Sequence, residues 1–331
     1  MASPTSLIIR LPNPLGDVVM ATPLLEILRA NLPTTHISVA GADHYESLLE
    51  GLTSFDQYLP IDAVARRSTS RMARILSSPQ ADAILLLPNS WSSVLAARKA
   101  GIPRRIGRRA AFRSLFLTDS LPAIHEARPM NLIYAEMAAP LLGSIDLEPP
   151  LPRLIARTPS QTSTSATCQI AIAPGAAFGV SKQYPPKLIA RAIQIAQEKI
   201  KLDVVLIGSP NEMPLLQSTA RALQLLGLDS TTITGTLSQA KTALARADVL
   251  LTMDSGARHM AAALGTPQVV LYGPTHPAWS AHSLCDTTIL RVETLDCLTC
   301  HKKVCPKSGH PCMQELDPAQ VADAILTRIS K

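Results

Sequence analysis

The sequence predicts an α/β protein made of two Rossmann-like, doubly wound domains, and three observations support this prediction. Short apolar runs alternate with longer helix-patterned segments, and no Asn-Gly hairpin signal separates them, which favours parallel βαβ units. A stretch rich in Ser and Thr interrupts the pattern at 157–168, and the alternation then begins again. The chain has 331 residues, of which 47% are apolar, enough for more than one buried core.

Each element of the first half follows from its local pattern. The apolar run at 6–12 stops at a turn and predicts a strand, and the run at 20–33 has helical spacing that ends at Pro33. Beyond them we expect a strand at 36–42, a helix from about Tyr45 and a buried strand at 81–88. The segment 92–107 is then expected to form a helix, a turn and a short strand.

The second half repeats this alternation. Amphipathic patterns predict helices at 185–200 and 237–247. Apolar runs that end in Gly or Pro predict strands within 169–177, 203–210, 248–256 and 267–274. We therefore expect an N-terminal domain at 1–156, a linker at 157–168 and a C-terminal domain at 169–331. The last helix is left free to pack back on the N-terminal domain. Because ligands of open α/β sheets bind outside the carboxyl ends of strands, the two domains are expected to face a central cleft.

Composition narrows the class of protein. The N-terminus lacks the pattern of a signal peptide, and no stretch approaches the roughly 18 consecutive apolar residues of a membrane span. These features predict a cytoplasmic protein, whose cysteines are reduced thiols or metal ligands rather than disulfides.

The net charge of +6 is concentrated in one segment. Between 66 and 113 only Asp82 opposes a series of cations, namely Arg66, Arg67, Arg71, Arg74, Arg98, Lys99, Arg104, Arg105, Arg108, Arg109 and Arg113. The segment is either a solvated helix face or a surface for an anionic partner such as phosphates, carboxylates or an acidic bilayer. Nucleic acid is not expected, because the aromatic residues that would interleave with the arginines are mainly Trp91, Phe112 and Phe116.

Several nucleotide-binding patterns are missing from the sequence. Neither half carries G-x-G-x-x-G or G-x-x-x-x-G-K-[ST], which argues against dinucleotide oxidoreductases and P-loop NTPases. No Asp-x-Asp pair is available to clamp a divalent metal onto a diphosphate.

Polar clusters instead follow the predicted strands, at Gly16-Asp17, 174–185, 208–212 and 254–267. In the last cluster, Asp254 or Ser255 can cap a small-residue helix whose N–H groups would bind an anion, although an ordinary capped helix has the same pattern. In the second, Lys182 follows a loop containing Gly175, and a glycine loop with a lysine can clamp a diphosphate. A solvated loop lysine is the alternative.

Three of these segments resemble, in order and spacing, the motifs of the bacterial lipopolysaccharide heptosyltransferases, glycosyltransferase family nine. They are GDVVMATPLLEIL, PGAAFGVSKQYP and MDSGARHMAAALGTPQVVLYGPTHP, and the likeness extends over nearly the whole chain. The form GAAFGVSK and the Cys-rich tail are more similar to the heptosyltransferase II branch. Two departures stand out: Tyr184 replaces a usual Trp, and Ala257-Arg258 replaces more apolar or hydroxyl residues before His259.

The resemblance implies a GT-B fold and an inverting transfer of heptose from ADP-L-glycero-D-manno-heptose to heptosyl-Kdo-lipid A, without a cofactor or metal. It implies that Asp17 is the catalytic base and that Lys182 stabilises the departing diphosphate. A plain helix N-cap is the alternative role for Asp17. The nucleotide sugar would be held in the C-terminal domain by Gly175, Lys182, Glu212, Asp254, Ser255, Gly256 and His259. An exposed loop carboxylate is the alternative for Glu212.

The acceptor would bind the N-terminal domain. Gly16 would let it approach the backbone, and arginines among Arg98, Arg104, Arg105, Arg108, Arg109 and Arg113 would hold its carboxylates and phosphates or the bilayer. We single out Arg104, Arg105 and Arg108 for the acceptor. Because that acceptor lies in the cytoplasmic leaflet, the protein is expected to be peripheral at the inner face of the inner membrane.

The same sequence features are compatible with two other kinds of enzyme. The chain could be a GT-B transferase with another sugar nucleotide or acceptor, or a UDP-sugar 2-epimerase, which also has two Rossmann-like halves. The tail contains Cys297, Cys300, Cys305 and Cys312 within a short span that begins with C-x-x-C. These cysteines are either ligands of a structural zinc ion or reduced thiols that pack in a loop.

Overall fold

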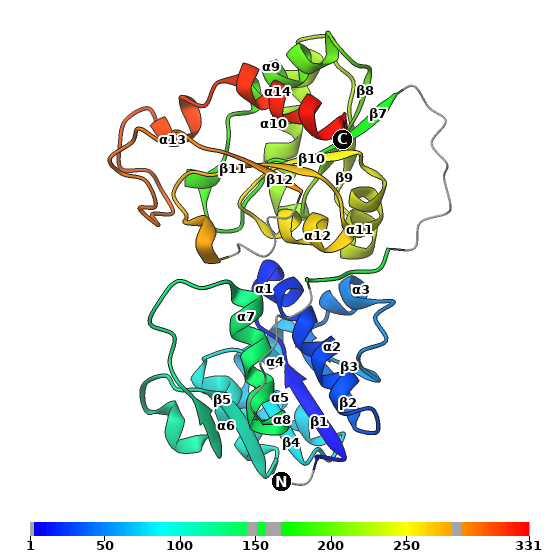
Figure 1. Ribbon diagram of the computed structural model, residues 1–331, viewed down its shortest axis with the longest axis vertical. Helices are drawn as coiled ribbons and strands as arrows, with labels where there is room; N and C mark the ends of the chain where they lie inside the picture. The colour runs from blue at the N-terminus through cyan, green and yellow to red at the C-terminus, as the bar shows by residue number, and fades with distance from the viewer. Residues whose placement is uncertain (1–2, 144–150, 157–166, 280–285, 331) are drawn as a thin grey trace. The chain divides into compact units, whose positions relative to one another are not determined.

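The computed structural model describes residues 3–143, 151–156, 167–279 and 286–330 (Figure 1). The chain divides into two compact units, the first made of the described residues up to Ile155 together with 278–279 and the second of the other described residues, and each is described by itself below. The predicted linker at 157–168 lies mostly outside the described residues, and its last residue, Cys168, begins a strand. No helix in the described ranges is both long enough and apolar enough to cross a membrane.

The first unit contains a parallel sheet with the strand order β3-β2-β1-β4-β5-β6. Its strands are β1 (Ser6–Arg10), β2 (His36–Ala42), β3 (Gln57–Ile61), β4 (Ala83–Leu86), β5 (Arg104–Arg108) and β6 (Asp119–Leu121). This is the order of a Rossmann sheet, in which the strand order reverses between β1 and β4. The carboxyl ends of these two strands therefore mark the expected ligand site.

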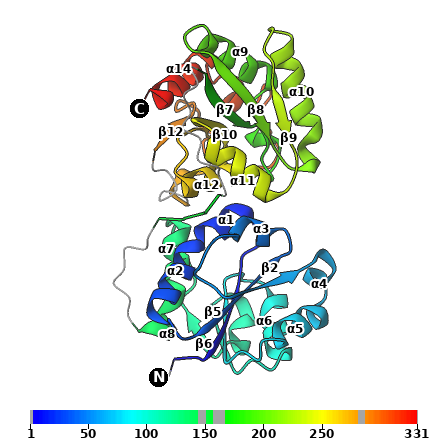
Figure 2. The ribbon, with the colours of Figure 1, turned by 90° about the vertical axis from the view of Figure 1, so that its right-hand side faces the viewer.

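Helices cover both faces of the first sheet. One layer contains α2 (Thr22–Asn31) in contact with α7 (Met130–Ala135), and α1 (Leu15–Met20) also contacts α7 (Figure 1). The other contains α4 (Ala63–Arg67), α5 (Thr69–Ser77) and α6 (Trp91–Lys99), which contact one another in sequence (Figure 2). Shorter elements complete the unit, namely α3 (Tyr45–Leu49), η1 (Ala111–Phe116), η2 (Glu136–Ala138) and α8 (Ala139–Leu142).

The helix predicted at 20–33 is α2 in the structure, and a separate short helix, α1, precedes it. Helix α1 begins at Leu15 and ends at Met20, and α2 starts again at Thr22 with Pro23 in its first turn. Proline lacks an N–H group and clashes with the preceding turn, so it is tolerated in the first turn of a new helix but not within a continuous one. The break places α1 as a separate short element directly after β1.

The second unit repeats the same sheet, with the order β12-β11-β10-β7-β8-β9 and all neighbours parallel. Its strands are β7 (Cys168–Ala173), β8 (Leu202–Ile207), β9 (Thr231–Ile233), β10 (Val249–Met253), β11 (Gln268–Leu271) and β12 (Thr287–Leu290). Its helices are α9 (Pro186–Gln197), α10 (Met213–Gln224), α11 (Leu237–Arg246), α12 (Gly256–Leu264), α13 (Pro311–Gln314) and α14 (Pro318–Ile329), with 3-10 turns η3 (Val180–Lys182) and η4 (Pro210–Glu212).

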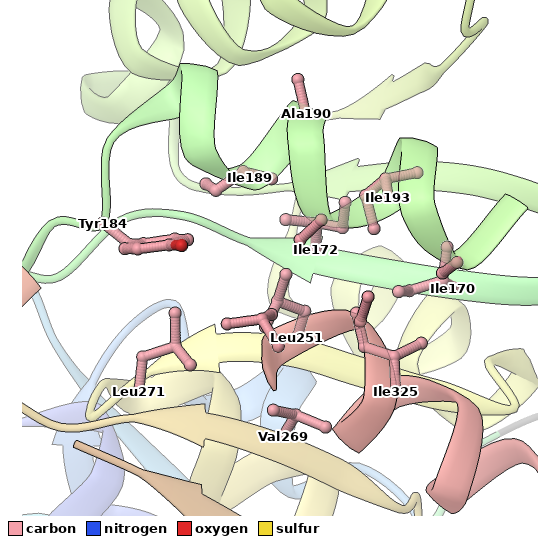
Figure 3. Close-up of a cluster of buried hydrophobic side chains, with 14 of the residues drawn as sticks. Ile170, Ile172, Tyr184, Ile189, Ala190, Ile193, Leu251, Val269, Leu271 and Ile325 are labelled. Carbon is pink, nitrogen blue, oxygen red and sulfur yellow. The ribbon is translucent and has the colours of Figure 1, made fainter. Parts of the chain in front are cut away.

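The core of the second unit lies between its sheet and the layer formed by α9 and α14 (Figure 3). Ile189 of α9 and Ile325 of α14 are fully buried there, together with the strand residues Ile170, Ile172 and Leu251. Helix α14 thus packs against α9 and β11 of its own unit. The apolar face of this last helix is therefore covered by elements of the second unit.

Candidate functional site

Asp17 lies in the first turn of α1, close to the carboxyl end of β1. The N-cap of α1 is Pro14, and no side chain caps the helix, so Asp17 does not have the N-cap role considered from sequence. Its half-buried carboxylate accepts no hydrogen bond and forms no ion pair with the described residues. A polar group in this state is unusual, because burial without a partner costs free energy.

Burial raises the pKa of Asp17 from its ordinary value to about 6. The negative charge of Asp17 also raises the pKa of Tyr134, after the larger effect of burial of that phenol. A carboxylate with a pKa near neutrality is a suitable general base, since it is ionised in the cell and accepts a proton more readily than an ordinary aspartate.

Asp17 lines a cavity of about 330 Å³ that lies entirely within the first unit. The wall includes Asn13 after β1, Asn89 after β4, Arg108 at the end of β5 and Tyr134 of α7. The cavity is therefore at the carboxyl ends of the strands where the order of the sheet reverses, as expected for a Rossmann ligand site.

Two buried arginines support the polar wall of this cavity from behind. Arg10 Nη2 donates to Asn13 Oδ1 at 3.1 Å, and Arg113 Nη1 donates to Asn89 Oδ1 at 2.9 Å. Because each amide oxygen already accepts a guanidinium hydrogen bond, the amide NH₂ groups are the donors left for a ligand. Neither asparagine was predicted as a site residue, although Asn13 and Asn89 each come directly after a predicted strand, at 6–12 and 81–88.

The structure separates the three arginines that were predicted to hold the acceptor. Only Arg108 lines the cavity, where it donates to the carbonyl oxygens of Pro122 and Ile133. Arg104 is paired with Asp119 at 3.0 Å, at the opposite end of β5. Arg104 and Arg108 are four residues apart in β5, so their backbones are separated by about 13 Å along the strand.

Arg105 also lies at the amino end of β5, and its Nε donates to the carbonyl oxygen of Phe116 at 2.8 Å. The guanidinium groups of Arg104 and Arg105 thus stabilise the strand and its neighbouring loops, away from the cavity. Gly16, in contrast, is adjacent to Asp17 in the first turn of α1.

In the second unit, Asp254 is the centre of a buried charge network at the end of β10. Lys182 Nζ lies 2.6 Å from Asp254 Oδ2 and 2.7 Å from its carbonyl oxygen. Arg258 Nε lies 3.1 Å from Oδ1, and Thr275 Oγ1 donates to Oδ2 at 2.6 Å. Two cations and one carboxylate give the cluster a formal charge of +1, which favours an anionic ligand.

The cations determine the protonation of the groups around them. Burial opposes ionisation of Asp254, but Lys182 and Arg258 outweigh it and lower the pKa of Asp254 to about 2. Burial, followed by the charge of Arg258, lowers the pKa of His259 to about 3, so its imidazole is neutral. His259 is therefore a hydrogen-bonding group in this site and not a positive charge.

Helix α12 begins at the same place. Its N-cap, Ser255, makes no side-chain capping bond, and its Oγ lies 3.2 Å from Thr252 Oγ1 instead. The first-turn N–H groups, beginning with Gly256, are thus not capped by the serine. Such a helix end binds phosphate through backbone donors and the positive end of the helix dipole.

Gly175 and Glu212 lie together where β7 and β8 end. A side chain at position 175 would meet Glu212 Oε1, since a Cβ there would lie 1.8 Å from that oxygen. Glu212 Oε2 accepts from Ser209 N and Oγ, at 2.8 Å each. Glu212 is thus part of a capping box, and the absence of a side chain at Gly175 makes room for its other oxygen.

The Cys-rich tail is an irregular segment in which one thiol is buried. Burial and then the thiols of Cys305, Cys297 and Cys300 raise the pKa of Cys312 to about 11, which indicates that the four cysteines are near one another. Within the described residues, no group of three or more His, Cys, Asp or Glu side chains has a geometry that would hold a metal ion.

Comparison with known proteins gives a consistent picture. The sequence pattern of glycosyltransferase family 9 (heptosyltransferase) matches residues 69–310. The chain is 30% identical over 293 residues to lipopolysaccharide heptosyltransferase 2 of Escherichia coli K12, a match that covers 80% of this chain and 82% of the relative.

Two solved structures share the fold. The structure of E. coli ADP-heptose lipopolysaccharide heptosyltransferase II has a TM-score of 0.82 at 24% identity and covers 98% of both chains. A glycosyltransferase family 9 structure from Veillonella parvula has a TM-score of 0.83 at 20% identity and covers 98% of this chain and 97% of that one. These likenesses confirm the predicted fold class of two Rossmann-like domains of the GT-B type.

Proposed function

Because the chain belongs to glycosyltransferase family 9, the heptosyltransferases, we propose that it transfers heptose from ADP-L-glycero-D-manno-heptose to heptosyl-Kdo-lipid A in the inner core of lipopolysaccharide. The observation that carries the mechanism is Asp17, a half-buried carboxylate that has no partner among the described residues, in a cavity at the switch point of the first sheet. The names of the relatives support the donor and the acceptor.

The reaction is a single displacement at the anomeric carbon. The acceptor hydroxyl oxygen forms a bond to that carbon, while the bond from the carbon to the diphosphate oxygen breaks and its electron pair leaves with ADP. Asp17 takes the hydroxyl proton, so that the nucleophile gains charge as the bond forms. Attack opposite the leaving group inverts the configuration at the anomeric carbon.

The second unit supplies the donor site. Lys182 and the first turn of α12, at Ser255 and Gly256, stabilise the negative charge that grows on the leaving diphosphate. Asp254 holds Lys182 in place. The carboxylate of Glu212, beside Gly175, accepts hydrogen bonds from the ribose hydroxyls, and neutral His259 supports the phosphate loop.

The first unit holds the acceptor. Asn13, Asn89 and Arg108 in the cavity wall donate hydrogen bonds to its sugar hydroxyls and carboxylates, next to Gly16 and Asp17. This assignment retains Arg108 from the sequence analysis and replaces Arg104 and Arg105 by the two asparagines.

We also propose that the first unit binds the cytoplasmic face of the inner membrane. Helices α4, α5 and α6 expose the cations Arg66, Arg67, Arg71, Arg74, Arg98 and Lys99. Next to α6, the 3-10 turn η1 exposes 76% of Phe112 and 80% of Leu115. Residues three apart in a 3-10 helix lie on the same side, so these apolar side chains form one ridge beside the basic helices.

Replacing Asp17 tests the proposal. The variant Asp17→Asn is expected to lose turnover about 10²- to 10⁴-fold with ADP-heptose and heptosyl-Kdo-lipid A, because no base then takes the proton. ADP binding, measured by calorimetry, is expected to be unchanged. Turnover near the wild-type level would rule out the base, and tighter binding of UDP or GDP than of ADP by the wild type would favour another sugar nucleotide.

A further inference from the structure

The charge network around Asp254 depends on two short loops. Lys182 comes from the loop after β7, and Thr275 comes from the loop after β11, and both contact Asp254 Oδ2 at 2.6 Å. The first loop contains only the short turn η3, and the described part of the second contains only a short 3-10 turn at 277–279. Neither of these described segments has an α-helix or a strand of its own to fix the two side chains.

One segment, residues 301–313 of the Cys-rich tail, fixes the first of these loops. Ser181 precedes Lys182 and is almost fully buried. Its N–H donates to the carbonyl oxygen of Lys303 at 3.1 Å, and its Oγ donates to that of Lys302 at 2.6 Å. Its carbonyl oxygen lies 2.7 Å from His310 Nε2. Because a carbonyl oxygen only accepts, Nε2 carries the proton in this contact.

The backbone at Gly179 is adapted to the same contact. A Cβ at position 179 would lie 2.5 Å from the carbonyl oxygen of Lys303, a distance that real Cβ atoms essentially never show. Gly179 also has a φ of +152°, which L side chains rarely adopt. Glycine is therefore required at position 179 for this loop to approach the backbone of Lys303 closely.

The same segment holds the second loop. The N–H of His301 donates to the carbonyl oxygen of Pro274 at 2.8 Å, one residue before Thr275. A Cβ at Gly273 would lie 3.0 Å from Cys312 Sγ and 2.9 Å from Met313 Sδ. Met313 is fully buried in the core of the unit, so the segment is anchored where it meets this loop.

We propose that residues 301–313 form a brace that positions Lys182 and Thr275 around Asp254 and thereby builds the subsite for an anionic leaving group. His310 of the brace and Ser181, which it contacts, are the positioning residues, and they act through the backbone next to Lys182 without touching the ligand. The nature of the ligand, a nucleoside diphosphate, rests on the proposed function. The contacts with both loops do not depend on that function.

A pair of variants at His310 tests the brace. In His310→Phe the ring remains but the hydrogen bond to Ser181 is lost, and the affinity for ADP is expected to fall about tenfold. In His310→Gln the side-chain amide can donate in place of Nε2, and most of the affinity is expected to return. The KM for ADP-heptose should rise in His310→Phe, whereas the KM for the acceptor should not change.

Two further variants separate positioning from general stability. Gly179→Ala should weaken ADP binding by steric contact with Lys303, whereas Val304→Ala, at a 67% exposed side chain in the same segment, should not. Hydrogen exchange in peptides covering 176–184 and 272–277 should become faster in Gly179→Ala and His310→Phe. Unchanged exchange and ADP affinity in both would overturn the brace. If the two variants exchange faster but the wild type itself does not bind ADP, the brace would be supported and the proposed function would be overturned.

Discussion

At the scale of single residues, two aspartates, Asp17 in the first unit and Asp254 in the second, have opposite environments. Asp17 is half-buried with no partner in the part of the chain that the structure describes, and its pKa is raised to about 6. Asp254 contacts two cations, and its pKa is lowered to about 2. Carboxyl groups whose pKa values are moved apart in this way commonly have different roles. In the proposed function, Asp17 exchanges a proton and Asp254 remains a fixed negative charge.

The raised pKa of Asp17 predicts a pH dependence of catalysis. The base must be ionised to accept a proton, so kcat/KM is expected to fall about tenfold per pH unit below about pH 6. The measurement is the pH profile of transfer at subsaturating acceptor. A profile that stays flat down to about pH 4 would show that Asp17 has an ordinary pKa or is not the base.

The lowered pKa of Asp254 predicts a pH dependence of stability. Its folded-state pKa of about 2 lies below the ordinary 3.8, so its stabilising effect is present above the ordinary value and is lost as the pH falls toward 2. Asp254→Asn should lower the free energy of unfolding by about 3 kcal/mol at pH 7, because two buried cations lose their shared counter-charge.

Urea titrations at several pH values measure this effect. The difference between wild type and Asp254→Asn is expected to shrink between about pH 4 and pH 2. The matched control is Asp323→Asn, whose carboxylate is 72% exposed and lies 3.7 Å from Lys199. That exposed pair should contribute less than about 1 kcal/mol at any pH. Equal losses in the two variants would contradict the buried network.

At the scale of elements, short irregular turns carry much of the functional surface. The proposed base lies in the six-residue helix α1, Lys182 lies in η3, and the apolar ridge of Phe112 and Leu115 lies in η1. Such turns are difficult to recognise from periodicity, because they are shorter than the window over which a helical pattern repeats. Each of these turns comes after a strand in the chain, α1 after β1, η3 after β7 and η1 after β5, and that strand determines where it lies.

The ridge of η1 predicts a measurable membrane contact. The double variant Phe112→Ser with Leu115→Ser should bind vesicles containing anionic phospholipid at least about tenfold more weakly, because two exposed apolar side chains are lost. Cosedimentation measures the binding, and added salt should weaken it further through the exposed arginines.

The control for this variant is Leu225→Ser in the second unit, where the leucine is 77% exposed. It should bind vesicles as the wild type does. The double variant should also keep the wild-type rate with an acceptor dispersed in detergent. Equal vesicle binding by all three proteins would exclude η1 as the contact.

At the scale of the whole molecule, the chain contains the same sheet twice. Read from β3 to β6 and from β9 to β12, both sheets have their first strand in the third position and reverse their order beside it, between β1 and β4 in one unit and between β7 and β10 in the other. Each reversal has a polar cluster at its carboxyl end, the cavity of Asp17 in the first unit and the network of Asp254 in the second. The repeated topology therefore places a polar cluster at the same edge of each sheet, and we propose these two clusters as the ligand sites.

The sequence alone determined the alternation of strands and helices, the two-domain fold class and the family, because periodicity, turn residues and motif spacing are local properties of the chain. It also located Asp17, Lys182 and Asp254 at the ends of strands. It did not show that Arg108 lines the cavity of Asp17 and that Arg104 and Arg105 do not, because proximity in sequence does not reveal which end of a strand faces the cavity. Only the tertiary structure decided that Arg10 and Arg113 orient Asn13 and Asn89, and that the tail meets the loops of Lys182 and Thr275. Those contacts join residues far apart in the chain, so they depend on packing that no local pattern encodes.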